Sequence, residues 1–275
     1  MTRIALFQSN TGIDPAANAA RLADAVRDAA AGGAEMLFTP EMSGLLDRDA
    51  MRAAGNLRRE ADDQVLAAVC AAARAHGIWV HLGSLAVRLD DGKVANRGFV
   101  IDREGRVTAR YDKIHLFDVD LPTGESWRES SVYSAGTQAV VVEGLPVGKL
   151  GLTICYDLRF PALFERLAEA GAEVIAVPAA FTVPTGIAHW HVLLRARAIE
   201  AGLFVVAAAQ AGRHEDGRAT FGHSLVIDPW GEVVLDMGEQ QGLGFADIDL
   251  ARIADVRSRI PALSHRRPIP ALADG

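Results

Sequence analysis

Near the middle of the chain, the stretch Gly151-Leu-Thr-Ile-Cys-Tyr-Asp-Leu-Arg-Phe-Pro161 joins an apolar segment to a proline. The apolar residues predict a buried strand, and Pro161 predicts the start of a helix, because proline is favoured at the first helical position. Cys155 stands in the turn between them. A thiol at such a turn is exposed at the edge of a sheet, close to backbone N–H groups that can bind an oxyanion. Taken alone, the segment fits equally well with Cys155 as a small core residue.

Strands and helices alternate on both sides of this stretch. In the N-terminal half, the patterns predict strands at residues 3–8, 36–38, 78–82, 96–102 and 107–112, and helices at 14–31 and 62–76. In the C-terminal half, they predict strands at 147–154, 173–177, 203–209 and 223–227, and helices at 161–170 and 189–201. Strands that alternate with helices normally form sheets that the helices cover, so we expect an α/β fold.

A short repeat indicates that the two halves are alike. The segments Gly33-Ala-Glu-Met-Leu-Phe-Thr-Pro40 and Gly171-Ala-Glu-Val-Ile-Ala-Val-Pro178 share their first three residues and their final proline, and both follow a predicted helix. A repeated motif within a repeated order of elements is typical of internal duplication. We therefore expect two similar halves in a single domain, residues 1–275, because no Pro- or Ser-rich linker separates them.

The composition restricts the class of protein. Hydrophobic residues make up 50% of the 275 residues and charged residues 23%, which is enough to form a sizeable core. The net charge of −7 and the scattered basic residues argue against binding to nucleic acid. No apolar run is long enough to cross a membrane, and the N-terminus lacks the features of a signal peptide. Because Cys70 and Cys155 show no disulfide or zinc spacing, we expect free thiols and a cytoplasmic location.

Two charged residues follow predicted strands and could activate a thiol. Glu41 comes directly after Pro40 at the end of one strand, and Lys113 ends another. Sites in α/β proteins gather at strand ends, where a carboxylate can take a proton and a lysine can stabilise an oxyanion. Each could separately be an ordinary surface charge. Their shared position at strand ends favours a common site with Cys155.

These segments resemble the nitrilase superfamily of carbon–nitrogen hydrolases. The similarity lies in Phe38-Thr-Pro-Glu41, Tyr111-Asp-Lys-Ile-His-Leu-Phe117 and Ile154-Cys-Tyr-Asp-Leu-Arg-Phe160, and extends to residues 185–190, 194–200 and 222–231. Three separate motifs in the right order carry far more weight than a single cysteine. The resemblance implies a four-layer α-β-β-α sandwich made of two similar halves.

The resemblance also implies a mechanism. Cys155 would attack an amide carbon and form a thioester, with Glu41 as the general base. Lys113 and the backbone N–H of Tyr156 would bind the oxyanion. Glu129 stands where the family has a second, supporting glutamate, although it could also be a solvated loop charge. Neither a cofactor nor a metal ion is implied.

Within the family, the chain is most similar to the branch that contains deaminated glutathione amidase and omega-amidase. Residues 205–214 resemble the deaminated glutathione amidase side more closely, so hydrolysis of deaminated glutathione is the first hypothesis. The alternative is an omega-amidase that acts on 2-oxoglutaramate. In both cases the substrate is a small amide that carries a carboxylate. Arg159 would face that carboxylate, or would instead pair with Asp157 or an interface carboxylate, and Phe181 and Thr185 match pocket walls.

Other segments bear on the substrate and on assembly. The loops at residues 44–59 and 119–135 would set the depth of the pocket. The face with Trp190, Leu194 and Arg197 at helical spacing is either core or a dimer interface, and the resemblance implies a homo-oligomer. The Pro- and Arg-rich end from residue 264 would wrap the surface or a partner subunit.

Two rival functions remain open. One is a Cys–His hydrolase, with His189, His214 or His223 as the base. The other is a non-catalytic binding or scaffolding subunit, which would have no need of the Glu–Lys–Cys set. A metal site on His189 and His191 is disfavoured, because neighbours at this spacing diverge on a helix. The segment at residues 222–226 lacks the second glycine of a serine nucleophile elbow.

Overall fold

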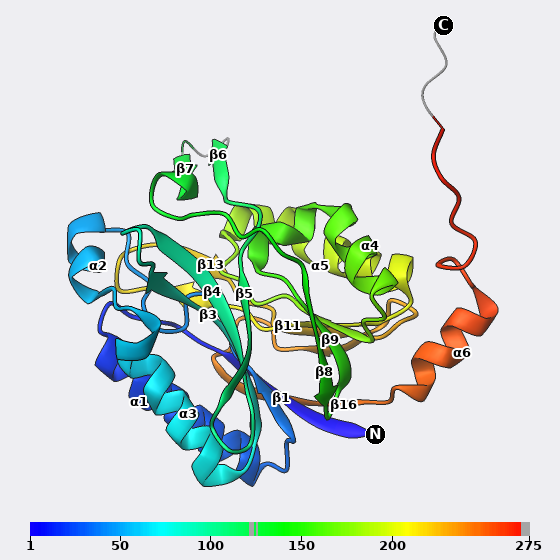
Figure 1. The fold of residues 1–275 in the computed structure, drawn as a ribbon, viewed down its shortest axis with the longest axis horizontal. Coiled ribbons are helices and arrows are strands. Elements are labelled where there is room, and N and C mark those ends of the chain that lie inside the picture. Colours follow the sequence, from blue (N-terminus) through cyan, green and yellow to red (C-terminus); the bar gives the residue numbers. More distant parts are fainter. Residues whose placement is uncertain (121–123, 125, 271–275) are drawn as a thin grey trace, which may run out of the picture.

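The first of two main sheets comes from the N-terminal half and the last strand. The computed structural model describes residues 1–120, 124 and 126–270. In these residues the first sheet has the order β16-β1-β2-β3-β4-β5 (Figure 1). Its strands are β1 (Thr2–Gln8), β2 (Met36–Phe38), β3 (Trp79–Arg88), β4 (Val94–Ile101), β5 (Val107–Asp112) and β16 (Gly242–Ile248).

The second sheet comes from the C-terminal half and has the order β15-β14-β11-β10-β9-β8. Its strands are β8 (Val140–Leu145), β9 (Gly148–Leu152), β10 (Val174–Ala176), β11 (Phe204–Ala207), β14 (Leu225–Ile227) and β15 (Val233–Asp236). Two short pairs lie outside these sheets: β6 (Asp118–Asp120) with β7 (Ser126–Arg128), and β12 (Ala211–Arg213) with β13 (Ala219–Phe221).

Helices connect the parallel strands in both halves. The helices are α1 (Pro15–Ala31), α2 (Ala50–Asn56), α3 (Gln64–His76), α4 (Pro161–Glu169), α5 (Val183–Ala201) and α6 (Ala251–Arg259). Short 3₁₀ turns occur at Glu60–Asp62, Glu129–Ser131 and Cys155–Arg159. Close to the predicted helices at 14–31 and 62–76, α1 begins at Pro15 with Asp14 as its cap, and α3 ends at Gly77 in the left-handed conformation.

The two halves have the same topology. In the first sheet β1, β2 and β3 are parallel, while β16, β4 and β5 run antiparallel to their neighbours. In the second sheet β9, β10 and β11 are parallel, and β8, β14 and β15 are antiparallel in the corresponding places. The glycines that open the repeated motif, Gly33 and Gly171, both have positive φ, 81° and 88°. The prediction of two similar halves is therefore confirmed.

The sheets pack against each other and are covered by helices on their outer faces (Figure 1). Side chains of β1 alternate: Ile4 and Leu6 join the core cluster that contains β9 and β10, whereas Ala5 joins the cluster of α1 and α3. On the other side, Phe164 of α4 and Trp190 of α5 pack onto the second sheet. This arrangement is the predicted four-layer α-β-β-α sandwich.

The structure differs from the sequence-based prediction at α5. The helix begins at Val183, before the predicted start at residue 189, and Gly186 lies inside this additional part. Glycine lowers helix propensity, so the sequence pattern there favours a loop. A Cβ at Gly186 would collide with the ring of Phe221, which explains why a glycine stands at this position. The face with Trp190, Leu194 and Arg197 is buried, so it is core rather than an interface.

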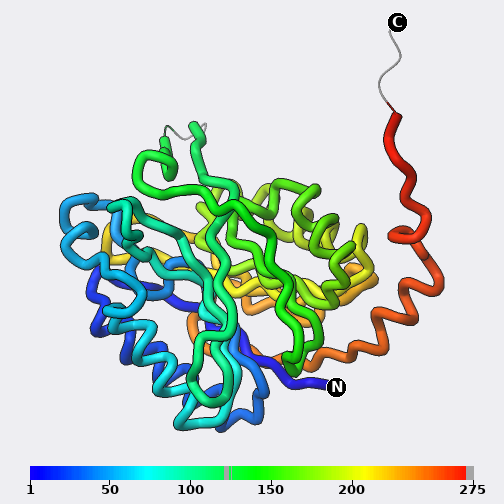
Figure 2. The backbone as a smooth tube through the Cα atoms, viewed as in Figure 1, coloured from blue at the N-terminus to red at the C-terminus, as the bar shows by residue number. Residues whose placement is uncertain are grey.

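The C-terminal segment leaves the body of the molecule after α6 (Figure 2). Arg266 is its anchor, at 3.3 Å from carboxylate oxygens of both Glu165 and Glu169 on α4. Part of the predicted wrapping segment, residues 271–275, lies outside the described residues, as do residues 121–123 and 125 of the predicted loop. Within the described part of the chain, no helix has the length and hydropathy needed to cross a membrane.

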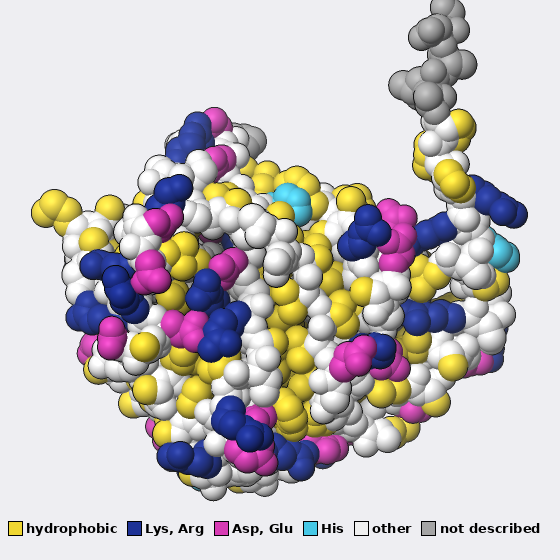
Figure 3. Space-filling model, in the orientation of Figure 1, with side chains coloured by type: hydrophobic (Ala, Val, Ile, Leu, Met, Phe, Trp, Pro, Cys, Tyr) yellow, Lys and Arg dark blue, Asp and Glu magenta, His cyan; other side chains and the backbone are white. Residues whose placement is uncertain are grey.

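Charged side chains on the face shown in Figure 3 include both signs, with lysine and arginine beside aspartate and glutamate. Nucleic-acid binding would require a continuous basic patch. This face does not present one.

Candidate active site

Three of the predicted site residues follow strands and meet in one cavity of about 690 Å³. Glu41 follows β2, Lys113 follows β5, and Cys155 begins the turn after β9. Cys155 adopts a left-handed conformation, with φ 49°. A residue with a side chain rarely adopts this conformation, and where it does, the surrounding structure must hold it in place.

The two halves approach each other closely beside Glu41. Gly83 of β3 touches the Thr39 carbonyl and Pro178, and a Cβ there would overlap with both. This contact brings the segment after β2 against the segment after β10. As a result, the backbone N–H of Ala180 donates to Glu41 Oε2 at 3.0 Å. The duplicated strand ends therefore build the site together.

Lys113 lies between two carboxylates. Its Nζ donates to Glu41 Oε1 at 2.9 Å and to both oxygens of Glu129, at 2.9 and 3.1 Å. Asn96 Nδ2 also donates to both acids, to Glu41 at 3.0 Å and to Glu129 at 3.1 Å. The backbone N–H of Phe117 donates to Glu129 at 2.7 Å. Glu129, the glutamate predicted to support the site, thus bonds Lys113 directly.

The protonation states follow from burial and charge. Burial opposes charge on Lys113, but Glu129 and Glu41 raise the pKa of its ammonium well above the ordinary range. Burial raises the pKa of Glu41, but the charge of Lys113, together with the hydrogen bonds from Lys113, Cys155 and Asn96, lowers that pKa below its ordinary value. For Cys155, burial and then the charge of Glu41 raise the pKa of the thiol well above its ordinary range. The resting site therefore contains an ionised carboxylate, an ammonium and a neutral thiol.

Asp157 holds the Cys155 turn against the segment that carries Lys113. Its buried carboxylate accepts from Tyr111 Oη at 2.7 Å, from the backbone N–H of Ile154 at 2.9 Å, and from the backbone N–H of His115 at 3.0 Å. Asp157 Oδ1 also lies 2.7 Å from His115 Nδ1. These bonds fix the position of Cys155 relative to β5.

Backbone donors are available next to the thiol. The N–H of Cys155 donates to the Pro178 carbonyl at 2.9 Å. The N–H of Tyr156 donates to no acceptor in the described part of the chain, and Tyr156 lines the cavity. Tyr156 and Lys113 can therefore both act as donors toward an oxygen bound beside Cys155.

Arg159 lines the same cavity. Its guanidinium carbon stands 5.9 Å from the ring of Tyr156 and 5.6 Å from that of Phe181, and both terminal nitrogens lie 3.3 Å from His189 Nδ1. Asp157 is bonded elsewhere, so the predicted alternative pairing of Arg159 with Asp157 is wrong. Among the described residues, Arg159 forms no ion pair. Phe181 and Thr185 also line the cavity, as the sequence predicts.

No histidine stands beside the thiol among the described residues that line the cavity. His214 is buried, with Nδ1 at 3.0 Å from the Thr11 carbonyl and Nε2 at 2.7 Å from Thr220 Oγ1. His223 Nδ1 lies 2.9 Å from Asp236 Oδ1. The geometry therefore gives no support to the Cys–His alternative.

His189 and His191 diverge, as expected for this spacing on a helix. His189 faces Arg159, whereas His191 Nε2 lies 3.0 Å from Asp236, which also contacts His223. No local motif indicates this second cluster, because its members come from α5, from the segment before β14 and from β15. Its hydrogen bonds join these three elements.

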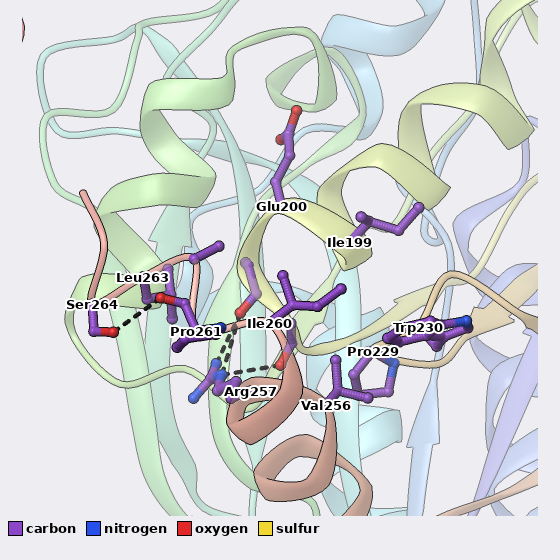
Figure 4. Close-up of a pocket in the computed structure, with 13 residues that line it drawn as sticks. Ile199, Glu200, Pro229, Trp230, Val256, Arg257, Ile260, Pro261, Leu263 and Ser264 are labelled. Carbon is purple, nitrogen blue, oxygen red and sulfur yellow. Dashed lines mark hydrogen bonds between the residues drawn. The ribbon is translucent and has the colours of Figure 1, made fainter. Parts of the chain in front are cut away.

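A second cavity, of about 350 Å³, lies between the ends of α5 and α6 (Figure 4). Trp230, Ile199 and Ile260 form part of its wall, and Arg257 donates to the backbone carbonyls of Ala201 and Gly202. The described residues that line it include neither a cysteine nor a lysine. The chemistry therefore belongs to the cavity that contains Cys155.

Comparisons with known proteins agree with this geometry. A family model described as carbon–nitrogen hydrolase matches residues 3–258. Deaminated glutathione amidase of Bos taurus is 41% identical over 269 residues, which cover 96% of this chain and 82% of that protein. The crystal structure of the Caenorhabditis elegans NitFhit protein superposes with a TM-score of 0.89 at 37% identity, over 97% of this chain and 65% of that longer one. Saccharomyces cerevisiae Nit3, a member of branch 10 of the nitrilase superfamily, gives 0.86 at 26% identity, over 97% of this chain and 96% of that one.

Proposed function

This chain belongs to the carbon–nitrogen hydrolase family, and on that premise we propose that it hydrolyses amides through a thioester on Cys155. The observation that carries the proposal is the hydrogen bond between the ammonium of Lys113 and a buried, ionised Glu41. Both residues line the cavity that Cys155 also lines. A binding subunit would have no use for this costly arrangement of buried charges.

The reaction begins with proton transfer from Cys155 to Glu41. Because the thiol is neutral at rest, a base must remove its proton as Sγ attacks the amide carbon. The carbonyl oxygen becomes an oxyanion, which Lys113 Nζ and the Tyr156 N–H stabilise. The C–N bond then breaks, and the leaving nitrogen takes the proton from Glu41.

The thioester is resolved by water. Glu41 takes a proton from a water molecule while the water oxygen attacks the thioester carbon. Lys113 Nζ and the Tyr156 N–H bind the second oxyanion. The C–S bond breaks, Sγ takes a proton back from Glu41, and the carboxylic acid product loses its own proton to solvent. Glu129 and Asn96 hold Lys113 and Glu41 in place through both steps.

For the substrate, we propose deaminated glutathione, a 2-oxo acid amide of cysteinylglycine. Support comes from relatives that bear this name and from Arg159, a cation that faces the cavity without an acidic partner in the described chain. A guanidinium binds a carboxylate strongly and in a defined orientation. An omega-amidase acting on 2-oxoglutaramate would use Arg159 in the same way, so this residue does not separate the two substrates.

An Arg159→Gln variant tests the carboxylate contact. We expect the KM for deaminated glutathione to rise roughly 10- to 100-fold, because a hydrogen bond to a charged group contributes roughly 1.5–3 kcal/mol. Release of 2-oxoglutarate, followed with a coupled dehydrogenase, gives the rates. Arg166→Gln is the matched control, since Arg166 is an exposed residue of α4 paired with Glu169. An unchanged KM for Arg159→Gln would show that the carboxylate binds elsewhere, and absence of release by the wild type would refute the substrate.

We also propose that the chain forms a homo-oligomer. The outer face of α5 leaves Ile187, Val192 and Ile199 exposed, at 72%, 68% and 53%, and Trp230 near its end is 46% exposed. Val192 and Ile199 are seven positions apart and therefore lie on the same side of α5, and exposed apolar side chains on one side of a helix favour association. Sedimentation velocity is expected to show a dimer or larger species, and Val192→Glu to shift it toward the monomer. A wild-type monomer at micromolar concentration would contradict the proposal.

The two cysteines are unpaired, which suits a reducing compartment. We therefore propose a cytoplasmic location, for which cell fractionation with an antibody to the chain is the direct check.

A further inference from the structure

We propose that Arg48, Trp127 and Arg218 form an anion subsite, which binds a carboxylate on the leaving-group side of the scissile amide. We call these three residues the mouth cluster. The inference rests on the proposed function, because it assigns the part of the substrate that leaves as the amine. It predicts which amides the enzyme prefers, a question that Arg159 leaves open.

The mouth cluster lines the same cavity as Cys155. Its members come from the segment before α2, from β7 and from the segment before β13. The guanidinium carbon of Arg48 stands 5.7 Å from the centre of the Trp127 ring, and that of Arg218 stands 5.2 Å from it. Two cations are therefore gathered around one aromatic side chain in the cavity wall.

A buried carboxylate holds the cluster in position. Asp216 Oδ2 accepts from Arg218 Nε at 2.6 Å and from the backbone N–H of Arg48 at 2.9 Å, and its other oxygen accepts from the Arg218 N–H at 3.0 Å. The Asp216 side chain is fully buried, with 0% exposure. Such a support fixes the two cationic segments relative to each other before any ligand binds.

Donors remain available after these bonds are made. Asp216 occupies Nε of Arg218 and leaves the terminal nitrogens, and Asp47, which lies near Arg218, is bonded to Arg52 at 2.6 and 2.8 Å. In the described chain, no carboxylate pairs with the Arg48 guanidinium. The Trp127 Nε1–H is buried and lacks an acceptor among the described residues. Guanidinium N–H groups without an acidic partner are suited to a carboxylate.

The two cationic places correspond to the two ends of one substrate class. Arg159, between Tyr156 and Phe181, would take the carboxylate of the acyl part. The mouth cluster would take the carboxylate of an amino acid or short peptide that leaves as the amine. Deaminated glutathione has both carboxylates, because its leaving group ends in glycine. In 2-oxoglutaramate the leaving group is ammonia, so the mouth cluster would have nothing to bind.

The test compares deaminated glutathione with its C-terminal amide, in which the glycine carboxylate becomes a neutral carboxamide. The acyl part and the scissile bond are the same in both. We expect the wild type to favour the acid by roughly tenfold or more in kcat/KM, since a charged hydrogen bond has about this effect. Arg48→Gln is expected to remove most of this preference, and Arg48→Glu to reverse it. Arg218→Gln supplies a second readout from the other arginine.

Arg27→Gln is the matched control, because Arg27 lies in α1, pairs with Asp24 and Asp28 and does not line the cavity. Its acid-to-amide preference is expected to equal that of the wild type. The inference is overturned if the wild type hydrolyses both compounds equally well, or if the preference persists in both Arg48→Gln and Arg218→Gln. If the wild type releases neither cysteinylglycine from the acid nor cysteinylglycinamide from the amide, the proposed function itself has failed.

Discussion

Replacement of Cys155 by alanine is expected to lower kcat for deaminated glutathione by roughly 10⁴- to 10⁶-fold, as for removal of other covalent nucleophiles. The variant loses Sγ, the atom that forms the thioester in the proposed mechanism. Alanine retains the Cβ, and the surrounding contacts of Asp157 and Pro178 with the turn do not involve the thiol. The fold should therefore persist, which circular dichroism and thermal unfolding would check.

Cys70→Ala is the matched control. Cys70 is half-buried in α3, and the residues that line the active-site cavity do not include it. Full activity of this variant would show that loss of a thiol as such is harmless. If Cys155→Ala kept more than a tenth of the wild-type rate, nucleophilic catalysis by Cys155 would be excluded.

Glu41→Gln is expected to lower kcat by roughly 10²- to 10⁴-fold, the usual effect of losing a general base. Glutamine preserves the shape of the side chain but cannot take the proton of Cys155 or of water. A second effect has the opposite direction. The charge of Glu41 raises the pKa of the Cys155 thiol, while Lys113 lowers it. Without the carboxylate charge that pKa falls, so at a fixed pH more of the thiol is ionised.

The two effects are measured separately. Alkylation of Cys155 by iodoacetamide, followed by mass spectrometry, is expected to be faster in Glu41→Gln than in the wild type, while turnover is much slower. Because a loosened fold would also expose the buried thiol, the melting temperature of Glu41→Gln is compared with that of the wild type. The Cys–His alternative makes the reverse prediction, in which Glu41→Gln has a mild effect and Gln in place of His189, His214 or His223 abolishes kcat.

The positions of the three central residues could be predicted because each follows a segment with a clear local signal. β2 is a short apolar run after a helix, β9 follows a tight turn and ends in buried residues, and β5 lies next to a glycine turn. Strand ends of this type collect at one edge of a sheet. The repeat of Gly33 and Gly171 also indicated the duplication, because both glycines occupy the same left-handed turn.

The supporting residues could not be predicted in the same way. Asn96 and Asp157 are polar side chains within apolar segments, and this is a local signal that polar groups there must find partners. The partners themselves are distant: Asp157 bonds Tyr111 across 46 positions, and Asn96 bonds Glu41 across 55. The Asp157–Tyr111 pair forms only when the two halves pack together, and the Asn96–Glu41 pair only when the first sheet is assembled.

Edge elements escaped prediction for a different reason. β15 is mostly exposed and β8 only half-buried, and their apolar runs, Val140–Val142 and Val233–Leu235, are shorter than those that mark a strand without other signals. The mouth cluster is also invisible in the sequence, because Arg48, Trp127 and Arg218 belong to separate segments with no shared motif. Their relation to Asp216 appears only in the folded chain.

The central claim is that catalysis passes through a thioester on Cys155, and a rapid-quench experiment tests it most directly. Enzyme in excess is mixed with deaminated glutathione, stopped with acid at successive times, digested, and the Cys155 peptide is weighed by mass spectrometry. We predict that a 2-oxoglutaryl group appears on Cys155 as cysteinylglycine is released, then disappears, and that hydroxylamine removes it. Release of cysteinylglycine with the Cys155 peptide unmodified at every time would contradict the claim.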